Sequence, residues 1–247
     1  MIKVDCPAPS KRVAKLLRNR QTRGTKWTSR HPQRVKGDRE INETLQQAFH
    51  GKCGYCEGIE AETIDHVLSQ ILHPDQVWNW ENYIWCCDVC QRRKGQKEPM
   101  SALGHLMVNP REDEPLWYLR IEANSGKMVA IPLSEEAIER GQISISLLEL
   151  DHRPDLDEQR RLMYLRVLDL VVQMVDPNSS CSRVEHAWQR LKEELHARRP
   201  YLAIVQQFFT YPPAEIEPLI IELYRIIPDA YTFLAPFRRP KPALMAE

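Results

Sequence analysis

The sequence predicts an α+β protein, in which a small zinc-stapled core of two strands and a helix is followed by a mainly helical C-terminal region. Three observations lead to this expectation: two Cys-x-x-C pairs, short β-prone runs between those pairs, and apolar residues that recur at helical spacing towards the C-terminus. We expect three regions, which are a basic arm over residues 1–37, the stapled core over 38–110, and a β-hairpin with helices over 111–247.

The composition is that of an ordinary globular protein, with 43% hydrophobic and 28% charged residues among 247. No apolar run approaches the ~20 residues of a membrane span, and the N-terminus lacks the apolar stretch of a signal peptide. We therefore expect a cytoplasmic protein without a membrane partner. A reducing compartment also suits thiols that are kept for metal.

Charge is unevenly distributed, although the chain has 34 basic and 34 acidic residues overall. Residues 1–36 contain eleven Lys or Arg and the single acid Asp5. Such an arm is typical of segments that follow a phosphate backbone. A solvated arm, or one that docks on an acidic protein, fits the pattern equally well. We expect Trp27 to be a packing contact rather than a platform for stacked bases.

Two helices are expected before the first cysteine pair. Ser10 is the candidate N-cap of a basic helix from Lys11 to about Arg18. Asp38 is expected to cap a second helix, which has apolar residues at helical spacing and ends at Gly51. This second helix delivers the chain to the cysteines.

Cys53, Cys56, Cys87 and Cys90 form the two Cys-x-x-C pairs. A two-residue gap lets a tight turn aim both thiolates at one ion, which is typical of tetrahedral zinc. Four thiolates leave no open coordination position, so the zinc would be structural. Four reduced, buried cysteines without metal are the alternative. Cys86 is a competing ligand, but the two-residue gap before Cys90 favours Cys87.

Between the cysteine pairs, polar residues occupy a strand, a loop and a second strand. Asp65 and His66 lie in the β-prone run 63–67, where neighbouring side chains point to opposite faces. One of them can therefore bind a cation while the other faces a substrate. After the last cysteine, Gln91 and Lys94 share a face of a helix expected to begin near Asp88. The N-terminus of such a helix favours a phosphate.

This stretch resembles the HNH, or ββα-metal, nucleases, in the subgroup whose ββα unit is bracketed by a zinc-binding cysteine quartet. The resemblance implies Asp65 as a ligand of a catalytic Mg²⁺ or Mn²⁺, His66 as the general base, and Asn82 as the catalytic-site residue that orients the loop beside the histidine. Gln91 stands where the family has Asn or His. Its amide oxygen can still coordinate Mg²⁺ in the catalytic site, although the extra methylene changes its reach.

The implied reaction is hydrolysis of a phosphodiester bond in DNA. Neutral His66 would take a proton from the attacking water, while the divalent ion would neutralise charge on the phosphate. Lys94, with Arg92 or Arg93, would hold the flanking phosphates. Two alternatives stay open, a non-catalytic zinc-stapled module that binds nucleic acid or acts as a scaffold, and an RNase acting on structured RNA.

After the core, a β-hairpin is expected that pairs residues 117–122 with 127–131. The capping pattern S-E-E-A at Ser134 predicts a short helix that ends at Gly141. From residue 156 on the pattern is helical, with later helices expected over 183–198, 200–210 and 214–226.

The first of these C-terminal helices has an apolar stripe of four residues, Leu162, Leu165, Leu168 and Val172. Apolar faces in this region are expected to pack in a helical bundle, with a partner subunit as the alternative. The sequence has no P-loop and no dinucleotide fingerprint, so nucleotide hydrolysis is expected of another chain.

The phrases I-S-L-L-E-L-D and D-L-D-E-Q-R-R-L extend the resemblance over about residues 1–175. They are similar to HNH nucleases encoded beside an ABC-type ATPase in bacterial anti-phage systems of the Septu kind, some of them retron-linked. The resemblance implies the nuclease effector of a defence complex, with that ATPase as its partner.

Overall fold

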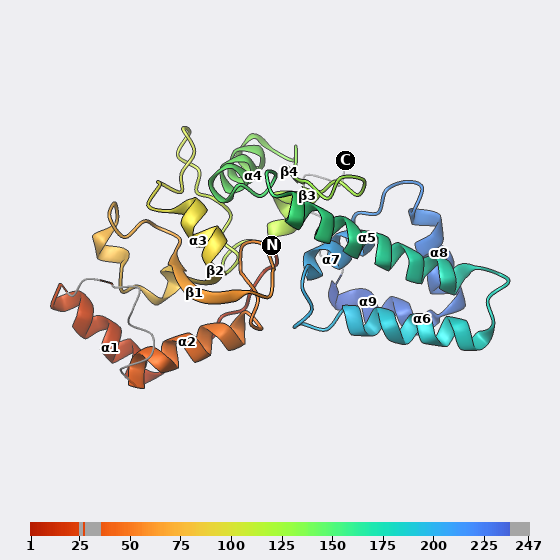
Figure 1. Ribbon diagram of the computed structural model, residues 1–247, viewed down its shortest axis with the longest axis horizontal. Coiled ribbons are helices and arrows are strands. Elements are labelled where there is room, and N and C mark those ends of the chain that lie inside the picture. The colour runs from red at the N-terminus through yellow and green to blue at the C-terminus, as the bar shows by residue number, and fades with distance from the viewer. Residues whose placement is uncertain (25–26, 28–35, 238–247) are drawn as a thin grey trace.

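The computed structural model describes residues 1–24, 27 and 36–237 (Figure 1). Its helices and strands are, in chain order, α1 (Lys11–Thr22), α2 (Lys36–Ala48), β1 (Ala61–His66), β2 (Tyr83–Cys87), α3 (Asp88–Lys94), β3 (Leu119–Ile121), β4 (Met128–Ala130), α4 (Glu135–Leu148), α5 (Pro154–Val175), α6 (Cys181–Glu194), α7 (Leu202–Thr210), α8 (Glu217–Ile226) and α9 (Pro228–Leu234). Figure 1 shows β1 and β2 with α1 to α3 in one half and a bundle of α5 to α9 in the other, with α4, β3 and β4 between them. The fold is therefore mixed α and β, and its described sheets are small.

The two N-terminal helices pack against each other. The predicted cap of α1 is confirmed, because Ser10 Oγ accepts a hydrogen bond from the Val13 N–H at 3.2 Å. Asp38 does not cap α2, because the helix begins earlier and Asp38 lies in its first turn. Its carboxylate instead accepts two hydrogen bonds from the Arg20 guanidinium, at 2.5 and 2.9 Å. This largely buried pair ties α1, which belongs to the expected basic arm, to α2.

β1 and β2 pair antiparallel, with Asp65 opposite Ile84 and His66 opposite Tyr83. α3 follows directly at Asp88 and packs on both strands. All residues of β2 are buried, and aromatic and β-branched side chains favour this pleated, packed environment. The expected order of strand, strand and helix is confirmed.

β3 and β4 form the predicted hairpin, and α4 packs on it. α4 begins at the predicted cap, where Ser134 Oγ accepts from the Ala137 N–H at 3.1 Å. The helix does not end at Gly141 as predicted. A Cβ at this position would lie 2.7 Å from both the Tyr118 carbonyl oxygen and the Ala130 Cβ. Gly141 therefore allows the close approach of α4 to the hairpin and does not act as a helix terminator.

α5 is the longest described helix, and it packs on α6, α7 and α8 in the expected bundle. Val167 and Leu170 lie on its buried face. The stripe seen in the sequence lies elsewhere, and Leu162, Leu165 and Val172 are exposed. Because α5 is apolar on more than one face, helical spacing could not tell which face turns inward. None of the described helices combines the length and the apolar character that crossing a membrane requires.

Candidate zinc centre and catalytic site

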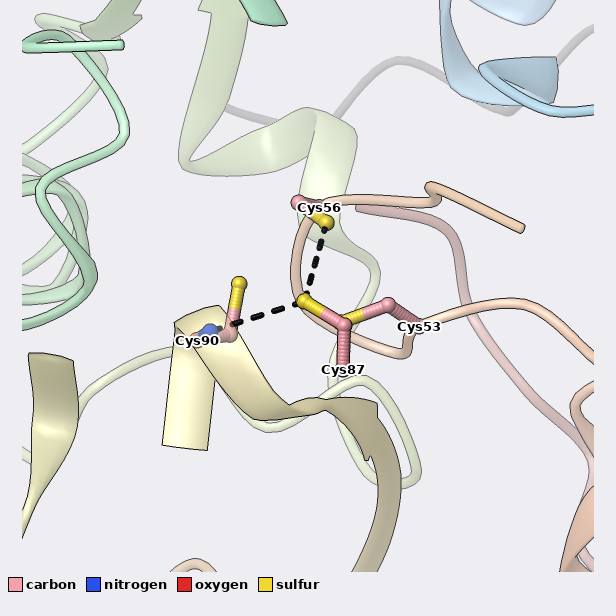
Figure 2. A group of neighbouring side chains, drawn as sticks. All are labelled: Cys53, Cys56, Cys87 and Cys90. Atoms are coloured by element: carbon pink, nitrogen blue, oxygen red, sulfur yellow. Dashed lines mark hydrogen bonds between the residues drawn. The ribbon is translucent and has the colours of Figure 1, made fainter. Parts of the chain in front are cut away.

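Four cysteine side chains converge at one point (Figure 2). Cys53 and Cys56 lie in the turn after α2, Cys87 ends β2, and Cys90 lies in the first turn of α3. Their Sγ atoms are all within 4.8 Å of one another, and those of Cys56 and Cys87 are 3.8 Å apart. Tetrahedral zinc with Zn–S bonds of about 2.3 Å places its sulfurs about 3.8 Å apart. The quartet therefore fits a structural zinc ion.

Backbone geometry explains why these cysteines meet. The Gly54 N–H donates to the Trp85 carbonyl oxygen at 2.9 Å, which holds the first cysteine pair against β2. A Cβ on Gly54 would lie 2.5 Å from the Phe49 ring, so the close approach requires glycine. Alternation along β2 then turns Cys87 into the quartet and Cys86 to the other face.

An arginine from the C-terminal half reaches this quartet. Arg153, the residue before α5, donates from Nη1 to Cys90 Sγ at 3.5 Å. Burial acts to lower the pKa of Arg153, but the charges of Cys90, Cys56 and Cys87 raise it above its usual value. A four-thiolate zinc site is negatively charged, so this cation would stabilise the loaded site from outside the ligand shell. The contact also links the helical bundle to the zinc centre.

Asp65 is buried on the side of β1 that faces α3. Its Oδ2 accepts a hydrogen bond from the Tyr55 hydroxyl at 2.7 Å, and Lys94 Nζ lies 3.1 Å from the same oxygen. Lys94 also donates to the His66 carbonyl oxygen at 2.5 Å, and its side chain is 1% exposed. Burial raises the pKa of Asp65, while Lys94 and Tyr55 oppose that rise. The cation bound by Asp65 is thus an ammonium group of the protein itself.

This arrangement does not fit a divalent ion at Asp65. Mg²⁺ needs near-octahedral oxygen ligands at about 2.1 Å, whereas the Asp65 carboxylate is enclosed and already bonded to a hydroxyl and an ammonium group. The Gln91 Nε2 donates to the Ile64 carbonyl oxygen at 2.8 Å, a bond that fixes the amide group but does not use the oxygen that would bind an ion. A divalent ion would require Lys94 to leave, because two cations beside one carboxylate oxygen repel each other. We therefore assign no catalytic step to a metal.

His66 faces the opposite side of β1, and only 2% of its surface is exposed. Its Nε2 lies 2.9 Å from the Val77 carbonyl oxygen, which can only accept, so Nε2 carries the proton. Nδ1 is then the basic nitrogen, and Gln70 donates to it at 3.1 Å. The rings of Trp27 and Tyr83 pack edge-to-face with the imidazole, with distances between ring centroids of 4.6 and 5.0 Å. Burial lowers the pKa of His66 to about 4, so the imidazole is neutral at pH 7.

Asn82 fixes the loop that connects β1 to β2. Its Oδ1 accepts from the Leu68 N–H at 2.7 Å. Its Nδ2 donates to the carbonyl oxygens of Leu68 and Gln76, at 3.2 and 3.1 Å. One side chain therefore holds both ends of the loop, and Gln76 directly precedes Val77, the partner of His66. These are the contacts that a residue needs if it is to orient the surroundings of the histidine.

The positive charges of α3 are largely engaged. Arg92 Nη2 lies 2.9 Å from Asp88 Oδ2, one helical turn earlier. Arg93 pairs with Glu149, the residue that caps the end of α4. Because Lys94 is buried, Arg92, whose side chain is 72% exposed, is the cation of this set that solvent reaches most easily.

The residues singled out in the sequence fall into two groups on opposite sides of β1, with Asp65, Gln91 and Lys94 towards α3 and with His66 and Asn82 towards the loop. Sequence reasoning missed two partners of these groups, Tyr55 and Gln70. Tyr55 lies between Cys53 and Cys56 and is therefore expected to be buried. A buried hydroxyl needs a hydrogen-bond partner, and this requirement could have predicted a polar contact for Tyr55. Gln70 follows His66 by four residues in a loop and carries no spacing signal.

The free energy of unfolding should fall as the pH drops from about 7 to about 5, and should fall less in His66→Gln. An unfolded histidine has a pKa of about 6.5, above the folded value of about 4, so the unfolded chain binds more protons in this window. The loss due to His66 is about 2 kcal/mol at pH ~5. Urea unfolding at both pH values measures it, with the exposed His186→Gln as control. Equal pH dependence in wild type and His66→Gln would contradict a buried neutral imidazole.

Comparison with known proteins finds distant relatives. No family model matches the sequence. The chain is 28% identical over 154 residues to Septu protein PtuB of Bacillus mycoides (strain KBAB4), over 50% of each chain. It is 25% identical over 170 residues to Septu protein PtuB of Bacillus thuringiensis, over 65% of this chain and 60% of the relative. The chain thus spans between half and three fifths of the length of these curated relatives.

Proposed function

We propose that this chain is an HNH-type endonuclease of a bacterial anti-phage defence system, and that it hydrolyses phosphodiester bonds in DNA. The observation that carries the proposal is the state of His66, in which one nitrogen donates to a backbone carbonyl and the other is an unprotonated base at neutral pH. The strand–strand–helix unit beside a zinc-type quartet supports the nuclease class. The distant likeness to Septu protein PtuB supports the defence role.

The proposed chemistry takes place at Nδ1 of His66. Water replaces the Gln70 amide there, and Nδ1 removes a proton as the water oxygen attacks phosphorus and the bond to the leaving sugar oxygen breaks. The leaving oxygen takes a proton from solvent, and the imidazolium then returns its proton to solvent. A pKa of about 4 makes the buried imidazole a weak base, and solvent that enters with the substrate would raise this pKa by relieving the desolvation. Asn82 keeps the loop in place, and Arg92 is the exposed cation of α3 that can contact a phosphate.

His66→Ala should slow cleavage by about 10²- to 10⁴-fold, which is the usual contribution of a positioned general base. Purified chain is incubated with supercoiled plasmid, single-stranded DNA and structured RNA, each in Mg²⁺, in Mn²⁺ and in EDTA. The three nucleic acids identify the substrate, and a comparison of the Mg²⁺, Mn²⁺ and EDTA reactions shows whether cleavage requires a metal. The same panel is run with any protein that copurifies with the chain.

The matched control is His73→Ala. His73 is a second histidine of the same loop, and its Nε2 lies 3.2 Å from Glu98 instead of in the His66 pocket. His73→Ala should cut at the wild-type rate and keep the wild-type melting temperature. His66→Ala removes a buried side chain and should lower the melting temperature, so circular dichroism is used to verify that it is folded in the assay. Cleavage by His66→Ala at the wild-type rate would remove His66 as the base.

An ABC-type ATPase is the partner that the sequence resemblance supports. The 247 residues shown contain no P-loop, and in this proposal the partner supplies the nucleotide hydrolysis that licenses cutting. Purification of the chain from its native bacterium, followed by identification of the bound proteins, tests this partner. Recovery of the chain without any ATPase would contradict it.

One observation favours a second candidate function, a non-catalytic module that binds nucleic acid or acts as a scaffold. Lys94 is bound to Asp65 where the resemblance implies a divalent ion. In this case neither the chain nor its complex would cleave any substrate of the panel above, while nucleic-acid binding would persist. Cleavage that depends on His66 excludes the second candidate.

A further inference from the structure

A hollow of about 390 Å³ lies directly against the pocket of His66. Three of its lining residues, Trp27, Gln70 and Val77, also contact the imidazole. Its volume is near the lower end of the roughly 300–1,000 Å³ of ligand sites. A group bound in this hollow would therefore be small and would lie beside the proposed base.

The lining of the hollow combines flat apolar surfaces with amides. Trp27 and Trp78 form a corner, with ring centroids 5.1 Å apart and planes tilted by 46°. Ile71 is 70% exposed here, although it is large and apolar. Gln21 and Gln70 add amides that both donate and accept hydrogen bonds. This combination suits a planar heterocycle with a hydrogen-bonding edge, which is the chemistry of a nucleobase.

The helix that ends at the hollow carries a row of positive charge. Lys11, Lys15 and Arg18 follow one face of α1 at spacings of four and three residues, and all three are exposed. α1 contains no acidic residue, and none of the ion pairs seen within the described part of the chain involves these three side chains. The last turn of α1 and the residues after it contribute Gln21 and Gly24 to the hollow. The positive row therefore leads to the hollow.

α3 offers less open charge near His66. Lys94 is buried against Asp65, Arg93 is paired with Glu149, and Arg92, although exposed, is paired with Asp88. A strand that reaches His66 would therefore meet the open cations of α1. A base inside a duplex is stacked and paired and cannot enter a side pocket without being extruded, whereas an unpaired base can enter directly.

We propose that the hollow binds one unpaired nucleobase next to the scissile phosphate, while the exposed face of α1 binds the neighbouring phosphates. This inference rests on the proposed nuclease function and adds its substrate class, a single-stranded or locally unpaired nucleic acid. Stacking on an aromatic side chain tolerates any base, so the hollow selects for an unpaired strand more than for a sequence.

The test is equilibrium binding by fluorescence anisotropy in EDTA, with gel electrophoresis at the end of each titration to verify that the probes are uncut. The probes are a short labelled single-stranded oligonucleotide, its duplex, and the same strand with one abasic position; DNA and RNA versions are compared. Trp27→Ala should weaken single-strand binding about tenfold and leave duplex binding unchanged. Trp27→Phe should restore most of the loss. An abasic position should weaken binding to the wild type but not to Trp27→Ala, because both changes remove the same stacking contact.

A separate experiment tests the row of positive charge on α1. Replacing Lys15 and Arg18 together by Gln should make the slope of log K against log salt less negative by about 1.4, since each phosphate contact on a single strand contributes about −0.7. Arg190→Gln, an exposed cation of α6, is the matched control and should leave the slope unchanged. An unchanged slope in the Lys15 and Arg18 variant would exclude α1 as the phosphate-binding face.

Two further results would overturn the base pocket. One is an unchanged single-strand affinity of folded Trp27→Ala, and the other is an equal affinity for single strand and duplex. If Trp27→Ala fails to fold, Ile71→Glu replaces it, because this exposed position tolerates a charge and a carboxylate there should repel the strand. Failure of the nuclease proposal is seen separately, because it appears in the cleavage panel and not in binding: either the wild type and its complex cleave no substrate, or His66→Ala cleaves at the wild-type rate.

Discussion

Cys87→Ser is expected to release zinc and to unfold the N-terminal half of the protein. A structural zinc site contributes an apparent binding free energy of about 10–16 kcal/mol, whereas whole domains are stable by only about 5–15 kcal/mol. Cys87 joins β2 to α3, so its loss also separates the strand from the helix that packs on it. Zinc content measures the first effect. Total tryptophan fluorescence, to which the buried Trp78, Trp80 and Trp85 of the N-terminal half contribute, measures the second.

The matched control for this variant is Cys181→Ser. Cys181 is exposed at the start of α6, far along the chain from the quartet, so this variant should keep its zinc and its melting temperature. The helical bundle has its own buried face, so Cys87→Ser should lose tryptophan signal before it loses most of its helical circular dichroism. A zinc-free Cys87→Ser variant with the wild-type melting temperature would contradict a structural role for the zinc ion.

Lys94→Met is expected to cost about 3–5 kcal/mol, although it replaces a polar residue with an apolar one of similar length. Lys94 is the buried counter-ion of Asp65, and removing one member of a buried pair leaves the other charge uncompensated. Denaturant unfolding measures the decrease in the free energy of unfolding. Arg92→Met on the exposed side of the same helix should change stability by less than about 1 kcal/mol, because its pair with Asp88 is solvated.

The pH dependence of Lys94→Met identifies the cause. Burial already raises the pKa of Asp65 in the folded protein, and loss of Lys94 should raise it further. A carboxyl group with a raised folded pKa binds more protons in the folded state, so the variant should regain stability relative to wild type as the pH falls towards that raised pKa. Adding Asp65→Asn to Lys94→Met should recover part of the loss at neutral pH. A variant as stable as the wild type at neutral pH would show that the ion pair is not formed.

Local rules predicted where two of the helices begin. Ser10 and Ser134 cap helices because the hydroxyl accepts a hydrogen bond from a backbone N–H only three residues later, so the contact depends on local sequence alone. The same rules failed where a longer-range contact was stronger. Asp38 binds Arg20 from another helix instead of capping its own, and Gly141 lies mid-helix because the hairpin packs against it.

In the candidate site, too, local sequence predicted some features and long-range contacts determined others. His66 and Asn82 were recognisable as a motif, yet the tautomer of the histidine depends on Val77, which reaches it through a folded loop. Helical spacing placed Gln91 and Lys94 on one face of α3 but could not say that this face turns inward onto β1. The pKa of His66 likewise follows from burial under side chains that are distant in sequence.

The sequence by itself determined which cysteines can share a metal ion and in which order strand, strand and helix follow, because both depend on spacings of a few residues. Only the tertiary structure decided that Lys94 is the cation of Asp65, that Gln70 and Val77 bind the two nitrogens of His66, and that α1 ends at the hollow next to the pocket of that histidine. These contacts join segments far apart in the chain, and their free energies depend on burial, which no short stretch of sequence specifies.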